Sequence, residues 1–242
     1  MTLQEFSDSF DVLLNSFAHS ADFGDAASRQ DIVLDEYEKS VFLTEAQEQI
    51  VLSYYAGKNG AESFEETEEV RRYLNSLVVS KVYGTSDLNE NVEESSANVR
   101  TRAKSYLVDE PNDLWFIVYE SAKYGTTDTC IDSKNAEVTP VTHDTFSRVF
   151  DNPFKGPNLR RVLRLDRDGK IELISKYPLS KYLLRYVKKL SPIILINLPD
   201  ELKVGEQSTA QNCALHKALH RPILELAVRL ALQSKGYNID KK

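Results

Sequence analysis

Apolar residues recur three and four positions apart near the start of the chain, at Leu3, Phe6, Phe10, Leu13 and Phe17. This spacing predicts a helix with one apolar stripe, and Thr2 and Glu5 stand at the positions of a capping box at its start. Asp35 and Glu38 repeat the same cap pattern before a second predicted helix. Gly57 can end that helix, because glycine adopts the left-handed conformation at little cost.

From about Leu77 the pattern changes to short runs typical of strands. We expect strands at residues 77–83, 99–108, 114–121, 162–165, 171–174, 182–187 and 193–196. Asp168-Gly169 predicts a tight hairpin turn, because both central residues of that turn need positive φ. A short helix is expected near residues 142–151, ended by Asn152-Pro153, since the residue before proline disfavours the α region.

A final helix is predicted between Pro222, which suits a first helical position, and Gly236, which suits a stop. It has apolar residues on two sides, and such helices are normally buried between neighbours. The sequence therefore predicts an α+β fold in which both chain ends form a helical bundle. We expect residues 1–76 and 212–242 in the bundle, and residues 77–211 in an inserted β-rich domain.

The composition is that of a globular protein that can bury a sizeable core. The chain has 242 residues, of which 41% are hydrophobic, and this excludes wholesale disorder. No apolar run approaches the ~20 residues that cross a bilayer, and the start of the chain lacks a basic segment followed by an apolar one. The two cysteines, Cys130 and Cys213, are too few for a disulfide framework. We expect a protein made and kept in a cytoplasm, with no membrane partner.

The net charge of −7 is distributed unevenly along the chain. Residues 1–70 contain 16 acidic and 3 basic side chains, whereas residues 155–192 contain 11 basic and 3 acidic ones. The two regions are either separate solvated faces or complementary surfaces on copies of one protein. Complementary surfaces can meet head to tail and close a ring. The acidic total disfavours a dedicated DNA-binding protein, which must neutralise phosphates.

Two short patterns resemble parts of metal sites. Cys213, His216 and His220 form C-x2-H-x3-H, but a closed zinc site needs a fourth ligand, and Cys130 lies in a different segment. The alternative is that this segment leads into the last helix with its histidines hydrogen-bonded or exposed. Around Asp168, an EF-hand would need carboxylates at both ends, where the chain has Arg164 and Ser175. We expect no metal ligand and no cofactor.

Catalytic signatures are missing from the sequence. It contains no phosphate-binding glycine loop, nucleophile elbow or H-E-x-x-H pair. His143 and Asp144 stand together, but Thr142 to Thr145 is better explained as a helix start, where side-chain oxygens accept backbone N–H groups. Nothing is arranged as a nucleophile, base and orienting group, so we expect no catalytic residues and no enzyme.

Basic and aromatic residues gather late in the chain: Arg160, Arg161, Arg164, Arg185, Lys188 and Lys189, with Tyr182 and Tyr186 nearby. They fit a nucleic-acid surface, a polar strand face or a surface for salt bridges between subunits. We favour the last, because the same chain provides a matching acidic region.

Five segments of the chain resemble one family of virion proteins. They are VTPVTHDTFSRVFDNPFKGPNLRRVLRL at residues 138–165, TLQEFSDSFDVLLNSF, LDEYEKSVFLTEAQEQIV, YLLRYVKKLSPIILINL and CALHKALHRPILELAVRLA. In order and spacing they resemble the head-to-tail connector proteins, ring or adaptor, of crAss-like podophages. The sequence departs most from that pattern at residues 84–98 and 125–135.

The resemblance implies a structural role in the virion at the head-tail connector. It implies a ring of identical subunits, twelve if it follows the portal, which touches the portal protein and adjacent connector or tail proteins. Genome DNA would pass through its channel without sequence-specific binding. Two rivals stay open: a nucleic-acid-binding module that uses the basic residues 155–192, and a small metal-dependent enzyme.

Overall fold

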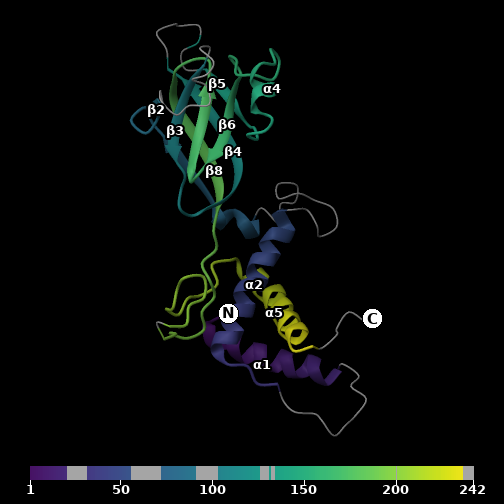
Figure 1. Cartoon of the computed structure of the whole chain (residues 1–242). Helices are drawn as coiled ribbons and strands as arrows, with labels where there is room; N and C mark the ends of the chain where they lie inside the picture. The colour runs from purple at the N-terminus through teal and green to yellow at the C-terminus, as the bar shows by residue number, and fades with distance from the viewer. Residues whose placement is uncertain are drawn as a thin grey trace. The chain divides into compact units, whose positions relative to one another are not determined.

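The computed structural model of the chain describes residues 1–20, 32–55, 72–90, 103–125, 131, 134–199 and 201–236. It divides into two compact units, one formed by Met1–Leu77 with Leu190–Lys242 and the other by Val78–Lys189 (Figure 1). Gly57, Cys130 and the first part of the strand predicted at residues 99–108 lie outside the described residues.

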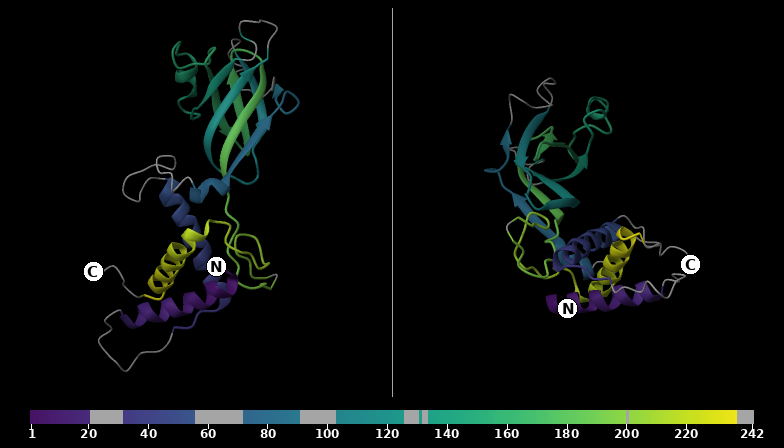
Figure 2. Two further views of the ribbon diagram at one scale, coloured as in Figure 1. Left: turned by 180° about the vertical axis from the view of Figure 1, so that it is seen from behind. Right: turned by 60° about the horizontal axis from the view of Figure 1, so that its bottom comes forward.

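The first unit is built from helices of both chain ends, as the sequence predicts. They are α1 (Leu3–Ser20), α2 (Glu36–Tyr55), the 3-10 turns η2 (Asn75–Leu77) and η3 (Lys217–Leu219), and α5 (His220–Ser234). Helix α5 packs against both α2 and α1 (Figure 2). No helix among the described residues is long and apolar enough to span a bilayer.

Both predicted helix caps are present. The backbone N–H of Thr2 donates to Glu5 Oε2 at 2.8 Å, and that of Glu5 donates to Thr2 Oγ1 at 3.2 Å. Glu38 N donates to Asp35 Oδ1 at 2.7 Å at the start of α2. These bonds satisfy N–H groups that have no partner within the helix, and so fix where each helix begins.

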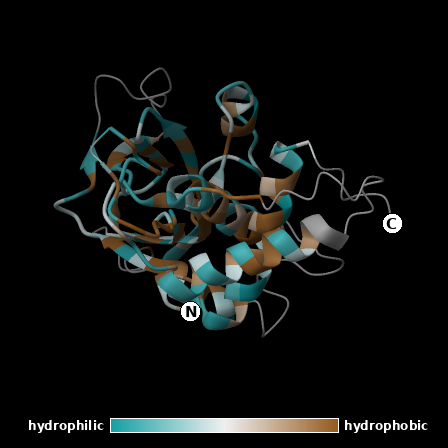
Figure 3. Cartoon of the chain, turned by 90° about the horizontal axis from the view of Figure 1, so that it is seen from below, coloured by the Kyte–Doolittle hydropathy of each residue, from teal (hydrophilic) through white to brown (hydrophobic). Residues whose placement is uncertain are grey.

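Helices α1 and α5 alternate hydrophobic and hydrophilic residues along their length (Figure 3) and bury mainly the hydrophobic ones, whereas α2 also buries Lys39, Ser40 and Gln47. Phe6 and Phe10 of the predicted stripe are fully buried, together with Leu14, whereas Phe17 is 40% exposed. In α5 the most buried large residues are Ile223 and Val228. The expectation that α5 is buried between neighbours is therefore confirmed.

A buried lysine joins α1 to α2. Lys39 is 4% exposed, and its Nζ lies 2.8 Å from Asp11 Oδ2 and 3.0 Å from Glu36 Oε1. It also donates to Ser7 Oγ at 3.2 Å. Burial alone would lower the pKa of Lys39, but its bonds to the two carboxylates outweigh burial and raise it. The charged ammonium is thus the form that links the helices.

The prediction of a strand at residues 193–196 is wrong. The chain there is extended and makes only an isolated bridge between Ile194 and Gln211. Its backbone groups bond to α2 side chains instead: Ile193 N donates to Thr44 Oγ1 at 3.1 Å, and Leu195 N donates to Ser40 Oγ at 3.0 Å. An extended apolar segment can pair with a helix in this way, which periodicity alone does not reveal. We propose that the inserted domain ends near residue 190, where the sequence suggested 211.

In the part of the second unit that the structure describes, eight strands form a curled sheet. They are β1 (Val78–Tyr83), β2 (Asn89–Glu90), β3 (Lys104–Asp109), β4 (Leu114–Tyr124), β5 (Asn135–Pro140), β6 (Arg161–Arg167), β7 (Lys170–Ser175) and β8 (Leu179–Lys188). Their order is β1-β8-β4-β5-β6-β7-β3-β2, and only β5 and β6 run parallel. Asp168 and Gly169 have φ of 43° and 70° in the β6–β7 hairpin, which confirms the predicted turn.

The two faces of this sheet have separate cores. Inside the curl lie Tyr124 and Tyr182 with valine, leucine and isoleucine side chains from most strands. On the outer face, Phe146 and Phe150 of the short helix α4 (Phe146–Phe150) pack against Leu163. The expected short helix is thus present, and it is anchored to the sheet by its two phenylalanines. The α+β class predicted from the sequence is confirmed.

Candidate assembly interface

The basic side chains predicted as one surface do not lie together. Arg160, Arg185 and Lys189 are exposed, Arg161 and Lys188 are half-buried, and Arg164 is only 9% exposed. Burial of Arg164 removes it from any docking surface. The exposed basic residues that remain lie on β8, directly after β8 at Lys189, and before β6 at Arg160.

Arg164 belongs instead to a buried ion pair inside the β unit. Its Nη1 lies 2.5 Å from Glu120 Oε2, and the Glu120 side chain is 6% exposed. The Tyr182 hydroxyl donates to the other oxygen of Glu120, and Asp166 lies 3.0 Å from Arg164 Nε. Burial raises the pKa of Glu120, while Tyr182 and Arg164 oppose that rise. Reversal of Arg164 would therefore disturb the fold.

Tyr182 and Tyr186 are also unavailable to a partner. They are 0% and 4% exposed and point into the curl. The Tyr186 hydroxyl donates to Asp113 Oδ1 at 2.8 Å, and burial together with that carboxylate raises the pKa of Tyr186 to about 12. Strand alternation places both tyrosines on the face opposite Arg185, and this could have been deduced from their spacing.

The exposed aromatic residue of this surface is Tyr119, which the sequence reasoning missed. Tyr119 pairs with Arg185 in the β4–β8 register, and the guanidinium lies 5.5 Å from the ring centroid. Tyr119 is 49% exposed. Four positions before Arg185 on β8, Lys181 is exposed and pairs with the half-buried Lys123. We call Tyr119, Lys123, Lys181 and Arg185 the basic strand surface.

Exposed carboxylates lie on two helices of the helical unit. Glu5 and Asp8 of α1 and Glu45 and Glu48 of α2 are exposed. Asp11 and Glu36 form ion pairs with the buried Lys39. The four exposed carboxylates are free of that buried lysine and suit contact with a basic partner.

The Cys213, His216 and His220 set serves packing and hydrogen bonding. Cys213 Sγ lies 3.2 Å from Gln47 Oε1, and burial raises the pKa of its thiol. His216 accepts a bond from Ala218 N at 3.3 Å at the start of η3. His220 is buried, and its Nε2 lies 3.3 Å from Leu215 O. Within the described residues, no group of three or more His, Cys, Asp or Glu side chains is placed to hold a metal ion.

We expect Cys213→Ser to fold normally and to leave the metal content unchanged. A serine can keep the contact with Gln47, and no cation has to be retained. Elemental analysis of protein purified without added metal should find far less than one zinc per chain in both proteins. One zinc per wild-type chain that is lost in the variant would contradict this prediction.

His143 and Asp144 lie at an exposed turn before α4. His143 Nε2 is 2.9 Å from Asp166 O, and a bond from Thr142 lowers the pKa of Asp144. The helix itself begins after Thr145, whose side chain makes no cap bond. These residues thus stabilise the turn that precedes α4.

Comparison with known proteins places the whole chain in one group. Residues 1–242 match a family model described as phage tail ring protein 3/4. The chain is 45% identical over 243 residues to Ring protein 3 of Bacteroides phage crAss001, covering 97% of this chain and 96% of that protein. It is 31% identical over 245 residues to Ring protein 4/5 of the same phage, covering 96% and 92%.

Proposed function

Since this chain belongs to the phage tail ring protein 3/4 family of crAss-like phages, we propose that identical copies of it form one closed ring between the portal and the tail. The match over the full length of the chain is the observation that carries the proposal. Membership of a family of structural ring proteins implies a non-enzymatic role. The protein is accordingly a component of the virion tail.

The finer position follows from the same proposal. The ring surrounds the channel through which genome DNA passes, and it contacts the portal protein and the adjacent connector or tail proteins. Twelve copies would match a twelvefold portal. The net charge of −7 suits a channel component that lets DNA pass without holding it, since phosphates bind to net positive surfaces.

Complementary charges support self-association. The basic strand surface lies on the β unit, and exposed carboxylates lie on α1 and α2 of the helical unit. Opposite charges on different parts of one subunit can steer copies head to tail, and heterologous contacts of that kind close into rings.

We expect the double variant Lys181→Glu/Arg185→Glu to slow ring assembly while leaving each subunit folded. Both side chains are exposed, so their reversal changes monomer stability by about 0.5 kcal/mol or less. Wild-type assembly should slow as salt increases, and the variant should lose that dependence. Time-resolved light scattering at several salt concentrations measures both effects.

The matched control reverses two exposed basic residues of the helical unit, Lys217→Glu/Arg229→Glu. It changes the net charge equally but leaves the basic strand surface intact. Equal slowing in both variants would show that only total charge matters, and would contradict the electrostatic interface.

A nucleic-acid-binding module is the second candidate function. The exposed Tyr119 beside Arg185 favours it, because a base can stack on the ring while the guanidinium meets a phosphate. Binding of a single-stranded oligonucleotide at moderate salt, lost in Tyr119→Ala, would support this candidate. The ring proposal predicts no such binding by the isolated protein.

A further inference from the structure

Phe154 is the most exposed large apolar side chain among the described residues, at 85%. It stands on the loop that follows α4, between Pro153 and Lys155, both exposed. A phenylalanine left in water costs solvation free energy unless a partner covers it. Its position beside a lysine suggests a partner with an apolar pocket and a nearby carboxylate.

Hydrogen bonds hold the Phe154 loop in one shape. Asn152 Oδ1 accepts bonds from the backbone N–H groups of Phe154 at 2.9 Å and Lys155 at 3.2 Å. Arg161 Nη1 donates to the Phe154 carbonyl at 2.8 Å. At Gly156, an added Cβ would lie 2.5 Å from Phe150 O, so the chain passes too close for another residue. A loop fixed in this way loses little entropy when its exposed ring is bound.

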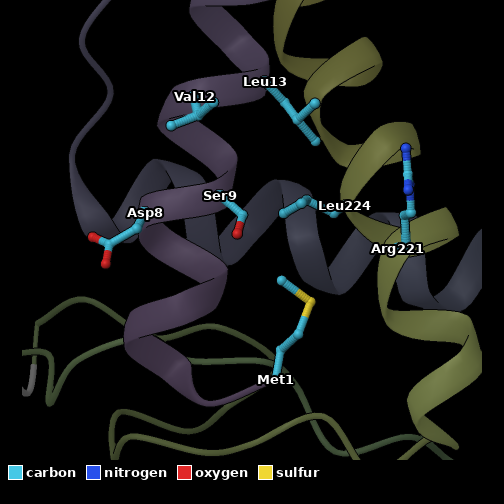
Figure 4. A pocket seen from close by; sticks show the side chains of 7 residues that line it. All are labelled: Met1, Asp8, Ser9, Val12, Leu13, Arg221 and Leu224. Carbon is cyan, nitrogen blue, oxygen red and sulfur yellow. The ribbon is translucent and has the colours of Figure 1, made fainter.

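A pocket of matching chemistry lies in the helical unit between α1 and α5. It has a volume of about 430 Å³. Leu13 and Leu224 point into the space between the two helices, and Met1 closes one end (Figure 4). Val12, which is 69% exposed, also lines it. The pocket therefore presents an apolar floor to solvent.

Charged residues stand on both sides of this pocket. Asp8 lines it from α1, and Arg221 lines it from α5, where its Nε lies 2.9 Å from Glu225 Oε1 (Figure 4). Both are exposed. The Phe154 loop carries an exposed lysine, Lys155, directly after the phenylalanine. The loop therefore offers an aromatic ring and a cation, and the pocket offers an apolar lining and the Asp8 carboxylate.

We propose that Phe154 of one copy inserts into the α1–α5 pocket of a second copy, with Lys155 facing Asp8. This contact rests on the proposed self-association, and it would join neighbouring copies in the ring. Loop and pocket are different surfaces of one chain, so the contact is heterologous and can repeat around a ring. An aromatic ring that fills a pocket within a charged rim is the usual form of a binding hot spot.

Cross-linking between two tagged chains tests the contact directly. Both full-length chains carry Cys130→Ser and Cys213→Ser; one then carries Pro153→Cys, next to the intact Phe154, and the other carries Val12→Cys. After mixing under ring-forming conditions, a short bismaleimide should join the two different tags. Cross-links only between two Pro153→Cys chains would indicate a symmetric contact and overturn the proposal. A pocket filled by another part of its own chain would give no cross-link between tags and would also overturn it.

Replacement of the Phe154 side chain should weaken assembly without unfolding the subunit. Phe154→Ala should raise the concentration needed for ring formation roughly tenfold or more, because a buried phenylalanine contributes that much to an association. Phe154→Leu should keep much of the affinity. Val33→Ala removes an apolar side chain that is 84% exposed in the helical unit, and it should have no effect.

Charge exchange distinguishes this contact from general hydrophobicity. Lys155→Glu and Asp8→Lys should each impair assembly when made alone, and the two together should restore it. If the Phe154→Ala variant forms rings as readily as the wild type, the proposed contact is overturned but the ring function is not. A wild-type chain that never self-associates would instead remove the ring function itself.

Discussion

Arg164→Met should destabilise the subunit by about 3 to 5 kcal/mol, because it leaves a buried carboxylate without its cation. The Glu120 side chain is 6% exposed, and Arg164 Nη1 lies 2.5 Å from it. Of the two polar partners of Glu120, Arg164 and Tyr182, only the Tyr182 hydroxyl remains after the substitution. Urea unfolding followed by circular dichroism measures the loss.

The pH dependence of this loss gives a second readout. Burial already raises the pKa of Glu120 in the folded protein, and without Arg164 it rises further. A carboxyl whose pKa is higher in the folded state than in the unfolded state lowers the stability of the folded protein as pH rises. The loss develops between the ordinary pKa of the carboxyl and its raised pKa. The variant should therefore lose more stability at about pH 8 than at about pH 4.

The double variant Arg164→Met/Glu120→Gln is the matched control. It removes both charges while the glutamine can still bond to Tyr182, so part of the lost stability should return. If Arg164→Met alone unfolds at the same urea concentration as wild type at every pH, the ion pair does not stabilise the β unit.

Ile223→Ala should cost about 2 to 5 kcal/mol, because it removes buried methyl groups and leaves a cavity in the helical core. Ile223 is 0% exposed on α5, which packs against α1 and α2. Thermal unfolding monitored at the helix signal should show a clear fall in the melting temperature.

Leu230→Ala provides the comparison on the same helix. The sequence predicts apolar residues on two sides of this helix, but Leu226 and Leu230 are only half-buried. Leu230→Ala should therefore cost less than Ile223→Ala. Equal melting temperatures for wild type and Ile223→Ala would mean that α5 is not part of the core.

Sequence reasoning predicted the features of the fold that depend on short-range chemistry. The caps at Thr2 and Asp35 and the turn at Asp168-Gly169 follow from residues within a few positions of each other. It failed for residues 193–196, whose backbone bonds go to Ser40 and Thr44 of a distant helix.

The candidate surface was harder to predict than the fold. Arg164 looked like its exposed neighbours because its partner, Glu120, lies 44 residues away. Strand alternation could have separated Tyr182 and Tyr186 from Arg185. Tyr119 became visible only when the β4–β8 register placed it beside Arg185.

Imaging of intact virions by cryo-electron microscopy tests the ring proposal most directly. Density between the portal and the tail should fit the curled sheet and the α1–α2–α5 helices, repeated as a closed ring around the DNA channel, with the Phe154 loop of each copy against the next. Absence of this protein from purified virions, or its presence there as isolated single copies, would contradict the account.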